Sequence, residues 1–259
     1  MHTHGPLDTS PSPRPLRTST VGQQLRAHAV HLYTASGVVC AFLATAELCA
    51  VQPDPRWVFG WLAVAGLIDA TDGPLARRWQ VTRHAPQIAG RTIDDIVDYL
   101  TFTFLPLVLV WRLQWLPPPV GLWPALAMIA SLLGFAHTGA KQEGEGFFRG
   151  FPSYWNVFAF YTGLWVPRYG PVLPAVVLVL LAVGTVLPVR FLYPNLAPWP
   201  WRGPLTVGAF VWVGLVLTML PSFPVVPSWL VWVSLVYPGG YTGLSVYLDL
   251  AARRRRHGA

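Results

Sequence analysis

The chain has 259 residues, of which 53% are hydrophobic and only 11% are charged, and its mean hydropathy is +0.45. This composition lies far from that of an average soluble domain and predicts a membrane protein. The formal net charge of +7 is explained by basic residues at a membrane surface, so we expect a lipid bilayer as partner and no nucleic acid.

Apolar segments follow one another along the chain. A helix needs about 20 mainly apolar residues to cross the hydrocarbon core of a bilayer, and eight stretches of roughly that kind occur, at residues 29–51, 57–76, 93–111, 120–139, 154–167, 171–189, 205–221 and 228–249. The expected fold is all-α, a polytopic membrane helical bundle with about eight transmembrane helices. It comprises a membrane domain at 29–250, a flexible cytoplasmic tail at 1–28 without a signal-peptide core, and a basic cytoplasmic tail at 251–259.

The basic residues are unevenly distributed over the two predicted sides. With a cytoplasmic N-terminus, all of the 18 Lys and Arg residues except Arg56, Arg112 and Arg168 fall on the cytoplasmic side. Short cytoplasmic loops are normally rich in these residues. We therefore expect eight spans with both termini in the cytoplasm.

The second and third segments contain a group of acidic residues. Asp69 and Asp72 stand at i and i+3 near the cytoplasmic end of the second segment, and Asp94 and Asp98 stand at i and i+4 near the start of the third. Each pair shares one helix face, so an antiparallel hairpin can bring the pairs together. Intramembrane acids are functional by default, and four carboxylates suit two Mg²⁺ or Mn²⁺ ions. The pattern predicts phosphoryl-transfer chemistry at the cytoplasmic face.

Small and basic residues follow the first acidic pair. Gly73 and Ala76 would let a phosphate-bearing ligand approach the backbone, and Arg77 offers a planar fork for phosphate oxygens. The alternative interpretation is that Gly73 and Pro74 merely bend the helix and that Arg77 marks the membrane edge.

Eight positions in order resemble the signature of the CDP-alcohol phosphotransferases. They are Asp69-x2-Asp72-Gly73-x2-Ala76-Arg77, then twelve residues, then Gly90-x3-Asp94-x3-Asp98. The resemblance implies that Asp69, Asp72, Asp94 and Asp98 hold two divalent cations. It implies further that Asp98 is the catalytic base, and that the CDP group is bound by Asp69, Gly73, Ala76, Arg77 and Gly90. A homodimer is a further implication.

The gap between Arg77 and Gly90 is several residues longer than is usual in that family. Together with the stretch FFRGFPSYWNVFAFY at 147–161, the long gap resembles a bacterial branch of the family that uses choline. This implies an enzyme of the bacterial cytoplasmic (inner) membrane that condenses CDP-diacylglycerol with choline to give phosphatidylcholine and CMP. Because aromatic faces bind quaternary ammonium groups, Tyr154, Trp155 and Asn156 are candidates for the choline site; an interfacial aromatic pair is the alternative.

Two other functions remain open. The same chemistry could act on serine, glycerol phosphate or inositol phosphate, although such acceptors would favour additional Arg or Lys near the site. A divalent-cation transporter could also use four aspartates, but the sequence contains no internal repeat of the kind common in transporters.

Overall fold

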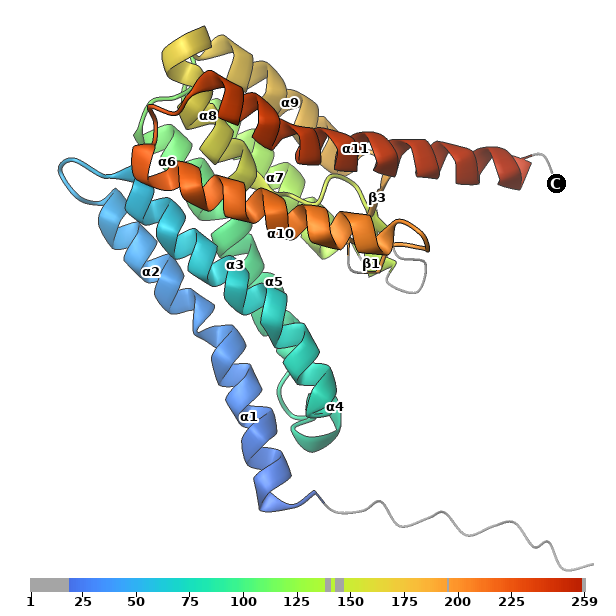
Figure 1. The fold of residues 1–259 in the computed structure, drawn as a ribbon. Coiled ribbons are helices and arrows are strands. Elements are labelled where there is room, and N and C mark those ends of the chain that lie inside the picture. The colour runs from blue at the N-terminus through green and yellow to red at the C-terminus, as the bar shows by residue number, and fades with distance from the viewer. Residues whose placement is uncertain (1–18, 138–140, 143–146, 195, 258–259) are drawn as a thin grey trace, which may run out of the picture.

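The computed structural model describes residues 19–137, 141–142, 147–194 and 196–257, and Figure 1 shows that they are almost entirely helical. The helices are α1 (Val21–Ala35), α2 (Gly37–Leu48), α3 (Pro55–Arg78), α4 (Val81–His84), α5 (Gly90–Asp98), the π-helix η1 (Tyr99–Phe104), α6 (Leu105–Arg112), α7 (Leu122–Ala136), α8 (Trp155–Tyr169), α9 (Val172–Val186), α10 (Arg202–Met219), the 3₁₀ turn η3 (Leu220–Ser222) and α11 (Ser228–His257). Each of the eight predicted segments lies largely within these helices.

Helices extend into both predicted tails. Helix α1 begins at Val21, because Thr20 and Gln23 form a capping box in which each side chain accepts a hydrogen bond from the other's backbone N–H. Residues 21–28 are therefore helical and do not belong to a flexible tail. At the other end, α11 continues to His257, so the first part of the basic tail at 251–259 extends this helix.

The third predicted segment is one helix with a widened turn. Helix α5, η1 and α6 follow without a break from Gly90 to Arg112. Pro106, at the start of α6, has no N–H to donate to the carbonyl of Phe102, which disfavours regular α-helical bonding at that point. The π-helical turn begins immediately after Asp98, and such turns often occur at functional sites.

The fold is nearly all-α, as predicted, with one small antiparallel sheet in addition. Strands β1 (Lys141–Gln142), β2 (Phe147–Arg149) and β3 (Arg190–Leu192) pair in that order, with Phe147 opposite Leu192. Strands of two or three residues are too short to show the alternation by which a strand is predicted. The sheet is attached to α11, where Tyr241 Oη donates to Leu192 O at 2.8 Å and Arg190 Nε donates to Asp249 Oδ1 at 2.7 Å.

The main hydrophobic core lies between α3, α6, α7, α8 and α9 and the turn after α10. Leu107, Leu109 and Leu164 are fully buried there. Phe59, Phe160 and Phe223 form an aromatic triplet with ring centroids 5.3 to 5.4 Å apart. This triplet joins α3 and α8 to the connection between α10 and α11, so helices that are distant in sequence form one body.

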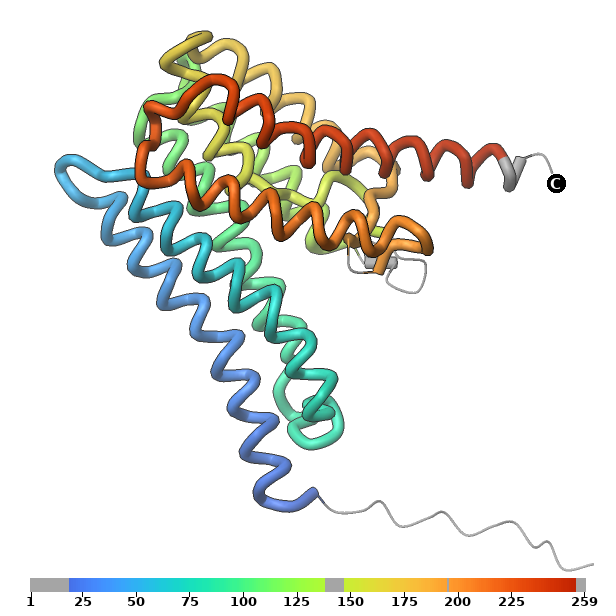
Figure 2. The backbone as a smooth tube through the Cα atoms, viewed as in Figure 1, coloured from blue at the N-terminus to red at the C-terminus, as the bar shows by residue number. Residues whose placement is uncertain are grey.

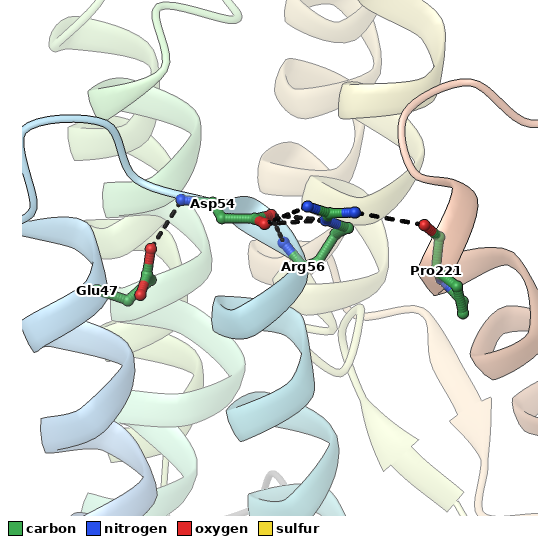
Figure 3. A network of polar contacts seen from close by, with 4 residues as sticks. All are labelled: Glu47, Asp54, Arg56 and Pro221. Atoms are coloured by element: carbon green, nitrogen blue, oxygen red, sulfur yellow. Dashed lines mark hydrogen bonds and ion pairs between the residues drawn. The ribbon is translucent and has the colours of Figure 1, made fainter.

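Several helix connections lie together at one end of the molecule. Figure 3 shows Glu47 accepting from Asp54 N at 2.8 Å, and Arg56 pairing with Asp54 at 2.6 Å while also reaching Pro221 O at 3.5 Å. The Arg56 guanidinium lowers the pKa of the Asp54 carboxyl by hydrogen bonding to it. Glu47 therefore stabilises a loop at this end of α3.

The other two arginines predicted to lie outside the cytoplasm also make their contacts among these connections. Arg112 Nη2 donates to Ala50 O at 3.1 Å, and Arg168 donates to the carbonyl of Val226. The ends of predicted segments one, three, five and seven are thus close to the starts of segments two and eight. This arrangement agrees with helices that alternate in direction.

At the opposite end the helices diverge. Figure 2 shows α1 and α3 running to one side while α10 and α11 run to another. Among the described residues, the stretches Val21–Leu48 and Arg202–Ser222 are long and apolar enough to cross a membrane, and α7 and α9 are shorter apolar helices. The predicted number of about eight spans therefore stays a prediction.

Candidate active site

Three of the four predicted ligand aspartates converge. One carboxylate oxygen from each of Asp69, Asp94 and Asp98 lies within 4.8 Å of the others, and all three side chains are partly buried. Asp69 is on α3, whereas Asp94 and Asp98 are one turn apart on α5. The predicted hairpin is therefore present, and its open end carries the cluster.

Asp72 is the exception to the predicted arrangement. Its side chain is buried, with 7% of its surface exposed, but it is not a member of the group of three. At 100° per residue, Asp72 is rotated by about 60° from Asp69 around the axis of α3. Of the four carboxylates expected to converge, three therefore do so, and the fourth, that of Asp72, is buried outside the group.

Close packing fixes the helices that carry the cluster. Tyr33 on α1 forms a 2.7 Å hydrogen bond to Thr71 on α3, between Asp69 and Asp72. Helix α2 begins at Gly37, where an added Cβ would stand 2.5 Å from Val97 Cγ1, so this glycine allows α2 to approach α5. These contacts hold α3 and α5 in register against α1 and α2.

Arg77 stands two turns beyond Asp69 on α3, rotated from it by about 80° around the helix axis. Its guanidinium folds back toward Gly73, because a Cβ at Gly73 would be 3.4 Å from Arg77 Nη1. The side chain is exposed. An exposed guanidinium that folds back to Gly73, one turn from Asp69, can bind phosphate oxygens, and the missing side chain at Gly73 leaves it room.

Gly90 and Ala76 take part in packing. A Cβ at Gly90 would stand 2.7 Å from His31 Cε1, so the glycine permits α5 to start directly against α1. The Nε2 atom of His31 is buried and has no hydrogen-bond partner among the described residues. Ala76 packs against the small cluster formed by α1 and α4. The close packing of neighbouring helices explains why both residues are small. Their predicted part in binding CDP stays a prediction.

The residues suggested for choline lie in different environments. Trp155 is fully buried, and its indole N–H donates to Ser131 Oγ at 2.7 Å. It has no face open to a ligand, so its assignment to the choline site is corrected: it is a core residue. Asn156 Oδ1 accepts from the backbone N–H of Val157 at 2.9 Å. Tyr154 is partly exposed.

Tyr154 is the aromatic residue that connects to the carboxylates. Its hydroxyl interacts electrostatically with Asp69 and Asp98 and with Tyr193 and Tyr237. Its ring also lies 6.2 Å from that of Phe102, one turn beyond Asp98. Only the fold brings Tyr193 and Tyr237 toward this site, since they are distant in sequence. Sequence reasoning therefore missed them.

The donor set fits a hard divalent cation. Three carboxylates whose oxygens lie within 4.8 Å repel one another unless positive charge is close by. All-oxygen ligands are those that Mg²⁺ and Mn²⁺ prefer. Asp95, which lies outside the signature, forms instead a 3.9 Å ion pair with Arg91 on the surface of α5.

Similarity to known proteins indicates the class of protein to which this chain belongs. No family model matches the chain, and no solved structure matches it significantly. Curated relatives named phosphatidylcholine synthase do match. The protein from Rhizobium meliloti is 35% identical over 84% of this chain and 88% of its own length. That from Rhizobium johnstonii is 33% identical over 80% and 83%, and that from Mesorhizobium japonicum is 35% identical over 70% of this chain and 66% of its own length.

A helical body with a carboxylate cluster at the open end of a hairpin, and relatives of this kind, define a transferase of phospholipid biosynthesis. The chain belongs to the phosphatidylcholine synthase family. The prediction of an enzyme of phosphatidylcholine synthesis is thereby confirmed; its two substrates belong to the proposal below. The matches do not include a model of the wider CDP-alcohol phosphotransferase family, so that part of the resemblance remains a proposal.

Proposed function

We propose that this chain transfers the phosphatidyl group of CDP-diacylglycerol to choline, by the chemistry of the CDP-alcohol phosphotransferases. The observation that carries the proposal is the convergence of Asp69, Asp94 and Asp98 within 4.8 Å. These three residues belong to the signature, and although they are separated in the sequence they lie together in space. The names of the relatives add choline phospholipid synthesis.

The substrate diphosphate is placed between α3 and α5. Arg77 lies over Gly73 and binds phosphate oxygens through its planar guanidinium. Gly73 allows close approach to the backbone of α3, and Asp69, Ala76 and Gly90 complete the proposed CDP site. Two Mg²⁺ or Mn²⁺ ions, held by Asp69, Asp94 and Asp98 with Asp72 as the fourth ligand, would neutralise the negative charge of the diphosphate.

Asp98 is the proposed general base. Its carboxylate takes the proton of the choline hydroxyl, and the choline oxygen forms a bond to the lipid-linked phosphorus. The bond from that phosphorus to the bridging oxygen breaks, and CMP leaves with the electron pair. The transfer is a direct displacement that requires no covalent enzyme intermediate.

Tyr154 is the proposed aromatic contact of the choline ammonium group, with Asn156 beside it. A quaternary ammonium cannot donate an N–H hydrogen bond and binds instead to aromatic faces and nearby negative charge. Tyr154 offers a partly exposed ring, and its hydroxyl interacts electrostatically with Asp69 and Asp98. A cation there would lie close to the base that deprotonates its own hydroxyl group.

The proposed location is the bacterial inner membrane, with eight spans, both termini in the cytoplasm and the site at the cytoplasmic face. The contacts among the connections at one end of the molecule support alternating helices. Single cysteines at Arg83 and Gln114 in a protein lacking Cys40 and Cys49 test this topology. The thiol at position 83 should react from the cytoplasmic side and that at 114 from the opposite side; labelling of both from one side would overturn the layout.

Oligomeric state is a separate proposal. The family resemblance supports a homodimer, and large apolar residues on the surface of α10, such as Phe210 with 75% exposure, would face lipid or a second copy. Cross-linking in native membranes, before detergent is added, distinguishes a dimer from a monomer.

The reaction is tested by CMP release. Purified enzyme in mixed micelles receives CDP-diacylglycerol and Mn²⁺, with choline, serine, glycerol phosphate and inositol phosphate in parallel. Release that depends on choline supports the proposal, whereas release with another acceptor assigns the same chemistry to a different alcohol. Cation uptake into vesicles without any release of CMP would favour a transporter.

A further inference from the structure

The long connection between the two halves of the signature is an ordered structure that packs on α1. Its residues Val81 and Ala85 are buried against Ala27 and Val30 in a separate hydrophobic cluster. Ser19 Oγ and His84 Nδ1 share a 2.8 Å hydrogen bond that joins the start of α1 to the end of α4. The extra residues in the gap therefore build a second contact surface.

This surface encloses a basic cavity. A cavity of about 210 Å³ lies between the first turns of α1, the end of α3 and α4, and is lined by Gln23, Arg26, Arg78, Trp79, Gln80 and His84. Two of these side chains are guanidinium groups, and the lining as described includes no carboxylate. Its volume is several times the share of one water molecule, about 30 Å³. The cavity therefore has the charge and the room for an anionic group of phosphate size.

The cavity is distinct from the carboxylate cluster. Arg78 follows Asp69 by nine residues, which corresponds to a rotation of about 180° around an α-helix. Asp69 therefore faces α5, whereas Arg78 faces the opposite side, toward α1. Arg77, between them in direction, belongs to the cluster side because its guanidinium lies over Gly73.

An apolar stripe lies on the side of α1 that faces away from the cavity, about 120° from Arg26 and 180° from Gln23 around the helix axis. Val21, Leu25 and Leu32 lie within about 40° of one another on the helix, and they are 81%, 70% and 73% exposed. Arg26 is rotated by about 100° from Leu25, so the first turns of α1 have an apolar side and a basic side. This is the pattern of a helix that lies at the boundary between headgroups and acyl chains.

We propose that this cavity binds the phosphate of an anionic phospholipid, at the membrane boundary that is indicated by the apolar and basic sides of α1. The inference rests on the proposed membrane location but on no step of the transfer reaction. Arg26 and Arg78 hold the phosphate oxygens, while Gln23 and Gln80 donate further hydrogen bonds. A bound lipid would join α1 to the connection between Arg77 and Gly90, and so stabilise the positions of the two signature halves.

Lipid retention measured by native mass spectrometry tests the proposal. Purified full-length enzyme in detergent is titrated with phosphatidylglycerol, and zwitterionic phosphatidylcholine, which has no net charge, is the comparison. We expect wild type to bind phosphatidylglycerol at least about tenfold more tightly, and Arg26→Gln and Arg78→Gln to weaken it about fivefold each, since each basic side chain contributes about that factor near a lipid surface. The matched control is Arg83→Gln, which removes an exposed charge from α4 outside the lining and should change binding less than twofold.

The possible outcomes distinguish a lipid phosphate from a free phosphate or CMP, and they distinguish the lipid site from the proposed transfer reaction. Equal affinity for both lipids, or an equal loss in all three variants, would overturn the cavity assignment. Displacement of the lipid by millimolar inorganic phosphate would overturn the lipid assignment in favour of a free anion, and displacement by CMP would assign the cavity to the nucleotide site. Because the Arg78 side chain is exposed, the Arg78→Gln variant tests the cavity if Arg26→Gln fails to fold. Release of CMP, measured on the same samples, reports the proposed reaction independently.

Discussion

Replacing Asp98 by Asn should affect three measurable quantities: the Tm of the metal-free protein, the gain in Tm on metal binding, and the turnover of the enzyme. The amide preserves the shape of the side chain but removes its charge and its ability to accept a proton as a carboxylate. Because Asp98 is a member of the three-carboxylate cluster, its charge is repelled by those of Asp69 and Asp94 and would be attracted by a bound cation. The substitution therefore separates the metal site from general-base catalysis.

The expected size of the effect follows from the geometry. Two unit charges 4.8 Å apart repel by about 3.5 kcal/mol at an effective dielectric constant of about 20. Since the three side chains are partly exposed, solvent and salt reduce this to about 1 kcal/mol per pair. Asp98 takes part in two of the three pairs, so its neutralisation should stabilise the metal-free protein by about 2 kcal/mol. The corresponding rise in Tm is about 4 to 8 °C.

Intrinsic tryptophan fluorescence during heating, with EDTA or with Mn²⁺, measures this change. We expect Asp98→Asn to have the higher Tm in EDTA, to gain less from Mn²⁺ than wild type, and to lose a factor of about 10² or more in turnover. The control is Asp95→Asn, three residues before Asp98 but paired with Arg91 at the surface, which should leave all three quantities nearly unchanged. An unaltered Tm in EDTA with a full response to Mn²⁺ would refute the cation site, and normal turnover would refute the role of Asp98 as base.

Three further substitutions test other parts of the molecule. Tyr154→Ala should raise the choline KM several-fold, by about 1 kcal/mol for the lost aromatic face, and leave the KM for CDP-diacylglycerol unchanged; equal weakening of both would indicate a packing role. Asp249→Asn should lower the free energy of unfolding by about 3 kcal/mol, because Arg190 and Arg253 share this carboxylate, which is 1% exposed, and a loss under about 0.5 kcal/mol would contradict that. Gly150→Ala should lower Tm by several degrees, because its φ is +84° and a Cβ would stand 2.2 Å from a backbone oxygen; a wild-type Tm would show that the chain relaxes there.

The positions of the helices are determined by local sequence. Apolar stretches of sufficient length, Asp54 and Pro55 at the start of α3, and the capping pair of Thr20 and Gln23 act over one turn of chain. The faces of Asp94 and Asp98 likewise follow from helical periodicity alone. Such features are readable because each depends on residues only three or four positions apart.

The start of α1 shows where the same reasoning was incomplete. The polar residues before residue 29 made a tail the simpler interpretation, although Thr20 and Gln23 carry a capping signal. The length of the apolar stretch predicts that the first span starts near residue 29, whereas the helix begins where its backbone N–H groups find hydrogen-bond partners.

The tertiary structure alone decided which side chains meet. Asp72 has the spacing of a ligand yet lies outside the group of three, and Trp155 has the position of an interfacial residue yet bonds to Ser131 in the core. Periodicity specifies a direction around one helix axis, but the contact made in that direction depends on the crossing of a second helix. The basic cavity and the approach of Tyr193 and Tyr237 to Tyr154 have the same origin, because they join segments whose distance in the chain carries no pattern.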